Sequence, residues 1–246
     1  MRKYFVLPLL ISLIAAPVFA QDSIDQIKQA VSTQWDKLQS FSGAYDLTAS
    51  FKLKPEQTAP MNLVGGGTVD YAKVGETPRY KGFLWAGFSP TGRLLQAQAL
   101  YDGQIGYYEA LAPLFKLNAS GQATMAEIVP PGGKLLFDAM RKNLVNLTAL
   151  PAELVNGQDC YVLRASVKDA ESPVAGLKAW FAKATGILHK VTLLDAAGTE
   201  MAVITMKDLE VNGEMAGEAF KFVSLAPPPP PAPPAPAPAP AAATQK

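Results

Sequence analysis

Short runs of alternating apolar and polar residues, separated by turn-forming stretches, fill most of this 246-residue chain and favour a mainly β fold. The clearest case begins with KAWFAKATGILHKVTLLDAAG at positions 178–198. Its first part can run extended as far as a turn at 184–186, and residues 187–194 then alternate between two faces. A second turn leads into an apolar run at 201–206. The segment therefore predicts a three-stranded meander.

The same two-residue period recurs in the rest of the chain, between turn signals such as Asp102-Gly103. Together with the meander it predicts about ten strands. Each connection is a short turn or a helical segment, which favours one large antiparallel sheet. The further strands are predicted at 44–52, 68–71, 79–88, 93–101, 104–109, 160–165 and 219–223.

Two segments have the period of an amphipathic helix instead. The first, 23–41, opens with the capping box Ser23-Ile24-Asp25-Gln26, and the second covers 133–146. Two helices can cover only part of such a sheet. The sheet must therefore curl on itself or keep an apolar groove, and either outcome produces a cavity lined by aliphatic and aromatic side chains.

The two ends of the chain differ in composition from the part between them. Residues 1–20 have a basic start, an apolar stretch and a Val18-Phe19-Ala20 finish, which is the layout of a cleaved secretory signal peptide. Residues 226–246 hold ten prolines and are predicted to form a disordered tail. A single domain is expected over 21–225. We expect it in the periplasm, without a lipid anchor, because the residue directly after the cleavage site is not a cysteine.

Charge and reactive residues exclude several classes of function. Without residues 1–20 the chain has 20 basic and 21 acidic residues, and this net charge of −1 leaves no electrostatic footprint for nucleic acid. The single cysteine, Cys160, is interpreted as a small apolar strand residue. The single histidine, His189, is interpreted as a strand residue that is either hydrogen-bonded or exposed. No motif places either beside a base or a metal ligand. We therefore expect no enzyme activity, no cofactor and no metal site.

Several stretches occur in an order typical of one superfamily. After the leader and an amphipathic helix come YDGQIGYYEA (101–110), NGQDCYVLRA (156–165), AWFAKATGILHKVTLLDAAG (179–198) and VNGEMAGEAFKF (211–222). Together they resemble the LolA-like periplasmic lipoprotein-carrier superfamily, especially its outer-membrane lipoprotein-sorting members. The resemblance covers most of 22–223. It implies an incomplete, strongly curved antiparallel β-barrel of about ten strands, covered by two or more helices, whose apolar interior receives lipid acyl chains.

Two functions are open on this reasoning. The first is a non-enzymatic periplasmic carrier or binder of lipids or lipoprotein acyl chains, acting in lipoprotein sorting to the outer membrane. The alternative is a structural or interaction module of the envelope, with the barrel as a scaffold and the proline-rich tail as a tether to an envelope protein. We expect a monomer in either case.

The acyl contacts depend on which side chains face inward, and alternation alone does not decide this. Within 79–88 we choose the set with Phe83 and Trp85 over the set with Tyr80 and Leu84, because two basic residues share the first set near one end. Neighbouring strands supply the other contacts. The predicted lining of the ligand cavity is Phe83, Trp85, Leu95, Tyr107, Phe181 and Val191.

Overall fold

The fold is that of a computed structural model. It describes residues 22–51, 59–88, 92–112, 117–123, 131–215 and 217–225. The predicted signal peptide at 1–20 and the predicted tail at 226–246 lie outside these residues.

Both predicted helices are present. α1 (Ile24–Lys37) begins at the expected capping box, where the Ser23 hydroxyl accepts from Gln26 N at 3.2 Å and the Gln26 side chain accepts from Ser23 N at 2.7 Å. α2 (Gly133–Asn143) lies beside α1, and Lys28 Nζ is 3.3 Å from Asp138 Oδ1 between them. Each helix has one apolar side, which packs against the sheet.

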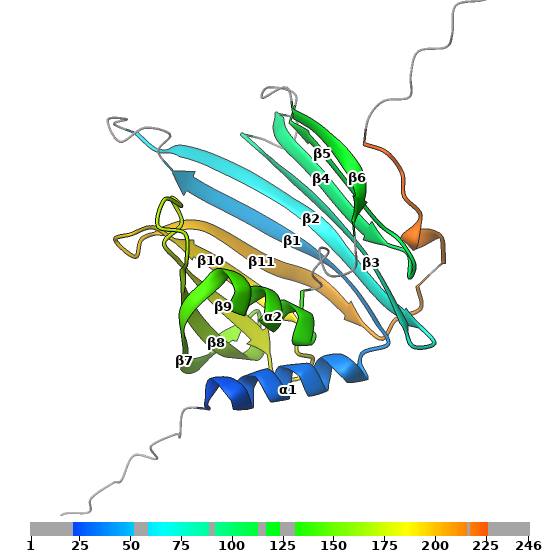
Figure 1. Ribbon diagram of the computed structural model, residues 1–246, viewed down its shortest axis with the longest axis horizontal. Helices are drawn as coiled ribbons and strands as arrows, with labels where there is room; N and C mark the ends of the chain where they lie inside the picture. The colour runs from blue at the N-terminus through cyan, green and yellow to red at the C-terminus, as the bar shows by residue number, and fades with distance from the viewer. Residues whose placement is uncertain are drawn as a thin grey trace, which may run out of the picture.

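Eleven antiparallel strands form one curved, open sheet in the order β6-β5-β4-β3-β2-β1-β11-β10-β9-β8-β7, with the helices against one of its faces (Figure 1). This confirms the predicted fold class. The middle of the sheet joins the two ends of the chain, because β1 pairs with both β2 and β11. The strands are β1 (Ser40–Phe51), β2 (Met61–Val74), β3 (Thr77–Gly87), β4 (Arg93–Tyr101), β5 (Gly106–Ala112), β6 (Leu117–Ala123), β7 (Leu144–Val155), β8 (Gln158–Val167), β9 (Gly176–Ala182), β10 (Leu188–Leu194) and β11 (Glu200–Val211).

Several boundaries differ from the sequence-based expectations. β1 starts at Ser40, inside the end of the first predicted helix, because Phe41 already pairs with Tyr71 of β2. β7 likewise starts at Leu144, inside the second predicted helix. β6 has no sequence signal, since its residues LNASGQA are mostly poor strand formers. The strand predicted at 219–223 is wrong: a short 3₁₀ helix, η2 (Gly217–Phe220), occupies this region.

A glycine in β2 lets a side chain of β1 reach across β2 to β3. Tyr45 of β1 reaches across Gly67 of β2, and its hydroxyl donates a hydrogen bond to the Phe83 carbonyl of β3 at 2.8 Å. A Cβ at Gly67 would overlap both the Tyr45 hydroxyl and the Phe83 carbonyl oxygen. Only a glycine at position 67 leaves room for the Tyr45 side chain, which can therefore cross β2 and bond to β3.

The two faces of the sheet have different covers. On one face, which we call the helix face, the Trp35 ring of α1 packs at 4.9 Å from the Tyr71 ring, and Phe137 of α2 stacks on Phe181 of β9 at 5.2 Å. The Trp35 ring packs directly against the backbone of Gly132. A Cβ at this position would overlap the ring, so a glycine is needed here. Most of the core lies between the helices and this face.

The opposite face, which we call the outer face, is covered over β3–β5 by the C-terminal segment 217–225. Phe220 packs there against Leu100. Glu109 is only 4% exposed and accepts hydrogen bonds from the Ser224 hydroxyl at 2.8 Å and from Leu225 N at 2.7 Å. The last described residues of the chain are therefore attached to the sheet.

These contacts predict different effects for two truncations. A chain that ends at Leu225 keeps them all and should melt at nearly the wild-type temperature. A chain that ends at Met215 exposes Leu100, removes buried Phe220 and leaves Glu109 without two donors. It should lose roughly 3 kcal/mol of unfolding free energy. Thermal and denaturant unfolding of the two truncated chains would measure this, and equal stability of both would show that the 217–225 contacts do not stabilise the domain.

Candidate functional site

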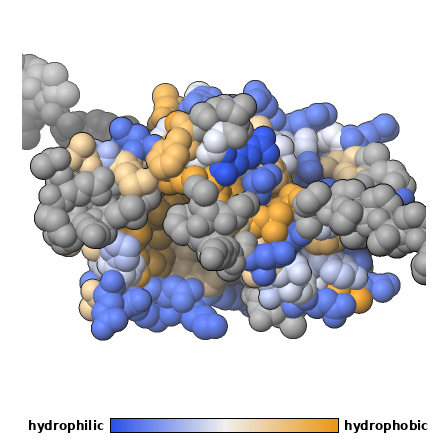
Figure 2. Space-filling model, turned by 90° about the horizontal axis from the view of Figure 1, so that it is seen from above, coloured by the Kyte–Doolittle hydropathy of each residue, from blue (hydrophilic) through white to orange (hydrophobic). Residues whose placement is uncertain are grey.

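An apolar cavity of about 250 Å³ lies on the helix face, near the middle of the sheet. Seen from above, the molecule is hollowed, and hydrophobic residues gather in this hollow inside a mostly hydrophilic rim (Figure 2). Strands from both halves of the sheet contribute to the cavity, and Pro131 lies on it from the segment before α2. Its lining is Tyr45, Thr68, Val69, Gly82, Pro131, Leu188, His189, Lys190, Val191, Ile204 and Met206.

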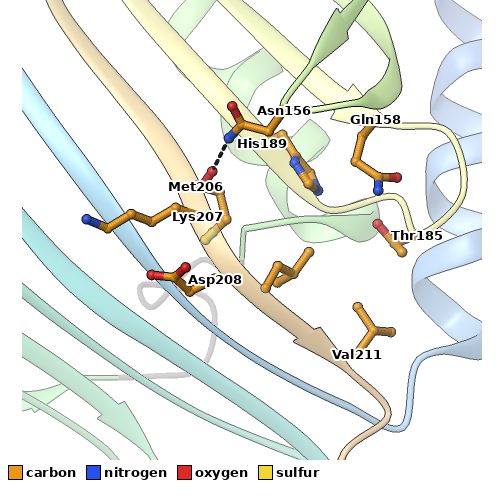
Figure 3. A pocket seen from close by; sticks show the side chains of 9 residues that line it. Asn156, Gln158, Thr185, His189, Met206, Lys207, Asp208 and Val211 are labelled. Carbon is orange, nitrogen blue, oxygen red and sulfur yellow. Dashed lines mark hydrogen bonds between the residues drawn. The ribbon is translucent and has the colours of Figure 1, made fainter.

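A second cavity, of about 490 Å³, shares His189 and Met206 with the first (Figure 3). It forms where the sheet divides: β10 pairs with β11 from Lys190 onward, while β11 beyond Met206 pairs only with β1 among the described strands. The turn after β7 lies across this gap, and Asn156 Nδ2 donates to the Met206 carbonyl at 2.8 Å. This second cavity has more polar walls than the first, and Gln158 and Thr185 are among its lining residues.

His189 occupies the boundary between the two cavities because of a β-bulge. Leu188 pairs with Phe181 and Lys190 with Trp180, so His189 is an extra residue without a partner on β9. Its side chain is only 5% exposed, and neither ring nitrogen has a hydrogen-bond partner among the described residues. Burial lowers the pKa of His189 below its usual value, which favours the neutral imidazole.

Three of the other ionisable groups around the cavities are paired, placed over an aromatic ring or kept neutral. Burial raises the pKa of Tyr45 to about 12, so its hydroxyl keeps the proton that it donates to Phe83. Lys207 Nζ is 2.6 Å from Asp46 Oδ1, and Lys190 Nζ lies 4.7 Å from the centre of the Trp180 ring. The hollow therefore offers apolar walls and one neutral, unpartnered imidazole.

The structure brings together only part of the predicted lining. Val191 lines the apolar cavity, and Leu95, paired with Ala86, lies on the helix face of β4. Phe181 is on the same face, but it is fully buried beneath Phe137 of α2. It therefore belongs to the helix–sheet core and does not line either cavity.

The other three predicted residues lie on the outer face. The Trp85 side chain lies on the same face as Asp46, with Arg93 over its ring. Phe83 is two residues away on the same strand and therefore points to this face too. The Tyr107 ring packs 5.6 Å from Phe222 of the C-terminal segment. The β3 side chains that face the helices are therefore Tyr80 and Leu84, and the choice of Phe83 and Trp85 as the inward pair is wrong. Both sets are apolar, so the β3 pattern could not separate them.

Sequence reasoning missed most of the observed lining. Gly82, Ile204 and Met206 have no feature that distinguishes them from other strand residues. Tyr45 and His189 lie there because of a glycine on the neighbouring strand and a bulge, and neither is visible in a single sequence. Cys160, in contrast, is as expected: it is fully buried in β8, and burial raises the pKa of its thiol to about 11.

The described part of the chain has neither a metal-ligand cluster nor a membrane-spanning helix. Within those residues, no group of three or more His, Cys, Asp or Glu side chains could hold a metal ion. None of the helices there combines the length and the apolar character needed to cross a membrane.

Comparison with known proteins places the fold. No protein-family model matches the chain, and neither does any curated protein. Among solved structures, MucB of Pseudomonas aeruginosa, in its complex with MucA, is similar with a TM-score of 0.50 and 12% identity. The match covers 80% of this chain but only 60% of MucB. This likeness shows a common fold alone.

Two further matches have lower TM-scores. A LolA superfamily protein from Nitrosomonas europaea matches with a TM-score of 0.34 and 10% identity, over 82% of this chain and 98% of that one. LprF from Mycobacterium bovis matches with a TM-score of 0.38 and 12% identity, over 78% and 93%. A LolA-like structure is thus among the matches, and the strongly curved open sheet with helices that the sequence resemblance implies is the fold observed.

The depressed pKa of His189 predicts a pH dependence of stability. The unfolded chain binds a proton with the ordinary histidine pKa of about 6.5, while the folded chain resists protonation. Stability should therefore be complete above about pH 6.5 and fall as the pH decreases below it, by at most about 1.4 kcal/mol per pH unit. His189→Gln should remove this slope. Denaturant unfolding at about pH 7.5 and 5.5 measures the difference, and the same slope in both proteins would contradict the buried neutral imidazole.

Proposed function

We propose that this protein is a non-enzymatic carrier or binder of lipids or lipoprotein acyl chains in the bacterial envelope, and that the chains lie in the hollow of the helix face. The observation that carries the proposal is the apolar cavity itself, which lies between the two halves of an open sheet and has room beside Gly82 for further atoms. Burying ten methylenes there would contribute about 8 kcal/mol before ordering costs, so affinity needs no ion pair.

The size and place of the cavities agree with such a ligand. The larger, more polar cavity of 490 Å³ is within the roughly 300–1,000 Å³ of ordinary ligand pockets, and the apolar cavity of 250 Å³ adjoins it. An apolar chain and a polar head would therefore each find a matching wall. The secretory leader predicted at 1–20 supports a periplasmic location, and the resemblance to lipoprotein carriers supports a place in lipoprotein sorting.

The second candidate function is an envelope interaction module. It is favoured by one comparison, since the similar MucB structure was determined with MucA as its protein partner. The C-terminal segment also supports it, because Glu109 attaches Leu225 to the outer face and fixes where the predicted tail at 226–246 begins. Here the sheet would act as a scaffold, and the helix-face hollow would need no ligand.

The carrier proposal predicts a sharp difference between two neighbouring substitutions. Gly82 borders the apolar cavity, and a Cβ added there has no atom within 4 Å, so Gly82→Leu should fill the hollow without a clash. Phe83→Leu places the same side chain on the outer face of the same strand. A fluorescent acyl probe should bind wild type and Phe83→Leu alike, and Gly82→Leu at least about tenfold more weakly.

Thermal unfolding of both variants serves as the control for folding. Equal probe binding by Gly82→Leu and wild type would remove the hollow as the acyl site. Absence of binding to wild type would favour the interaction module instead. Native mass spectrometry of protein from the envelope fraction adds an independent check, because a carrier should retain lipid mass and a processed chain should begin at Gln21.

A further inference from the structure

His189 is a feature of the hollow that an apolar container does not explain. Buried polar side chains nearly always have a hydrogen-bond partner, and leaving one without costs roughly 1–3 kcal/mol. Here both imidazole nitrogens lack a partner in the described part of the chain, although the side chain is only 5% exposed. A bulge in β10 holds the residue in this position, while its neighbours Leu188 and Lys190 keep their pairing with β9.

The imidazole borders both cavities, so its missing partner would lie where they meet (Figure 3). No described neighbour takes that role. The Asn156 amide donates to the Met206 carbonyl, and the Tyr45 hydroxyl donates to the Phe83 carbonyl. Thr185 Oγ1 accepts from Ile187 N at 3.3 Å. A neutral imidazole has one N–H donor and one acceptor nitrogen, so a full partner must both accept and donate.

The charges around His189 indicate that this partner is uncharged. An anionic head would need a cation, but Lys207 is paired with Asp46 and Lys190 lies over the Trp180 ring. Asp208 on the wall of the larger cavity would repel an anion. Tyr45 stays protonated, since burial raises its pKa to about 12. A fatty acid in its carboxylate form is therefore a poor match for this position.

We propose that His189 recognises an uncharged acyl ester with a free hydroxyl group, such as a monoacylglycerol. The acyl chain lies in the apolar cavity, the ester and hydroxyl bond to the two imidazole nitrogens, and the rest of the head extends into the larger cavity. This inference rests on the proposed acyl-binding function and names the chemical class of its ligand.

The test is displacement of a fluorescent acyl probe by three ligands with the same chain: 1-oleoylglycerol, methyl oleate and oleate. Wild type should bind 1-oleoylglycerol about tenfold more tightly than either of the others at neutral pH, because only it supplies both hydrogen bonds without a charge. His189→Leu keeps a side chain of similar size without nitrogen atoms. It should therefore lose the preference and bind 1-oleoylglycerol and methyl oleate with similar affinity.

The possible results separate this inference from the function on which it rests. If wild type binds the probe but does not distinguish the three ligands, a water molecule satisfies His189 and the inference is overturned, while acyl binding stands. If oleate is preferred, the head is anionic and the inference is wrong. If no acyl probe binds, both fail. The wild-type comparison needs no variant, and His189→Gln, which keeps a donor and an acceptor, should retain part of the preference if His189→Leu does not fold.

Discussion

Helix α1 holds together a sheet that cannot close on itself. In the order of the described strands β6 and β7 stand at the two ends, and among these strands no ladder of hydrogen bonds links the two ends. α1 makes the missing connection through its side chains. Its first turns place Ile27 and Val31 against α2 and β8–β9, and its last turn places Trp35 against β1–β3. The curvature of the sheet, and therefore the hollow, depends on this one helix lying across both halves.

The hollow follows from that arrangement together with two local irregularities. Gly67 leaves space for Tyr45 to reach β3, and the bulge in β10 turns His189 toward the interior. On the opposite side, segment 217–225 covers apolar residues of β3–β5 such as Leu100. One face of the sheet is thus shaped to enclose a space, and the other is filled by the chain itself.

Sequence reasoning predicts the elements better than it predicts their faces. The capping box fixes the start of α1, and β4 has the boundaries that its alternation and flanking turns indicate. The fold class follows from many such local signals that agree with each other. The cavity lining does not follow from such local signals, because β3 has apolar residues on both of its faces. Which face points inward depends on α1, more than forty residues away in the chain. Similarly, 219–223 has strand-like residues but packs on an outer face where no strand edge is open.

The two end strands of the sheet have a consequence for behaviour at high concentration. An unpaired strand offers backbone donors and acceptors to any second copy, which is how edge-to-edge aggregation begins. β7 is poorly suited to such addition, because Pro151 has no N–H to donate and the strand is irregular around Thr148 and Glu153. β6 has only seven residues, several of them small or polar. Neither end strand of this open sheet therefore offers a regular template for fibre growth.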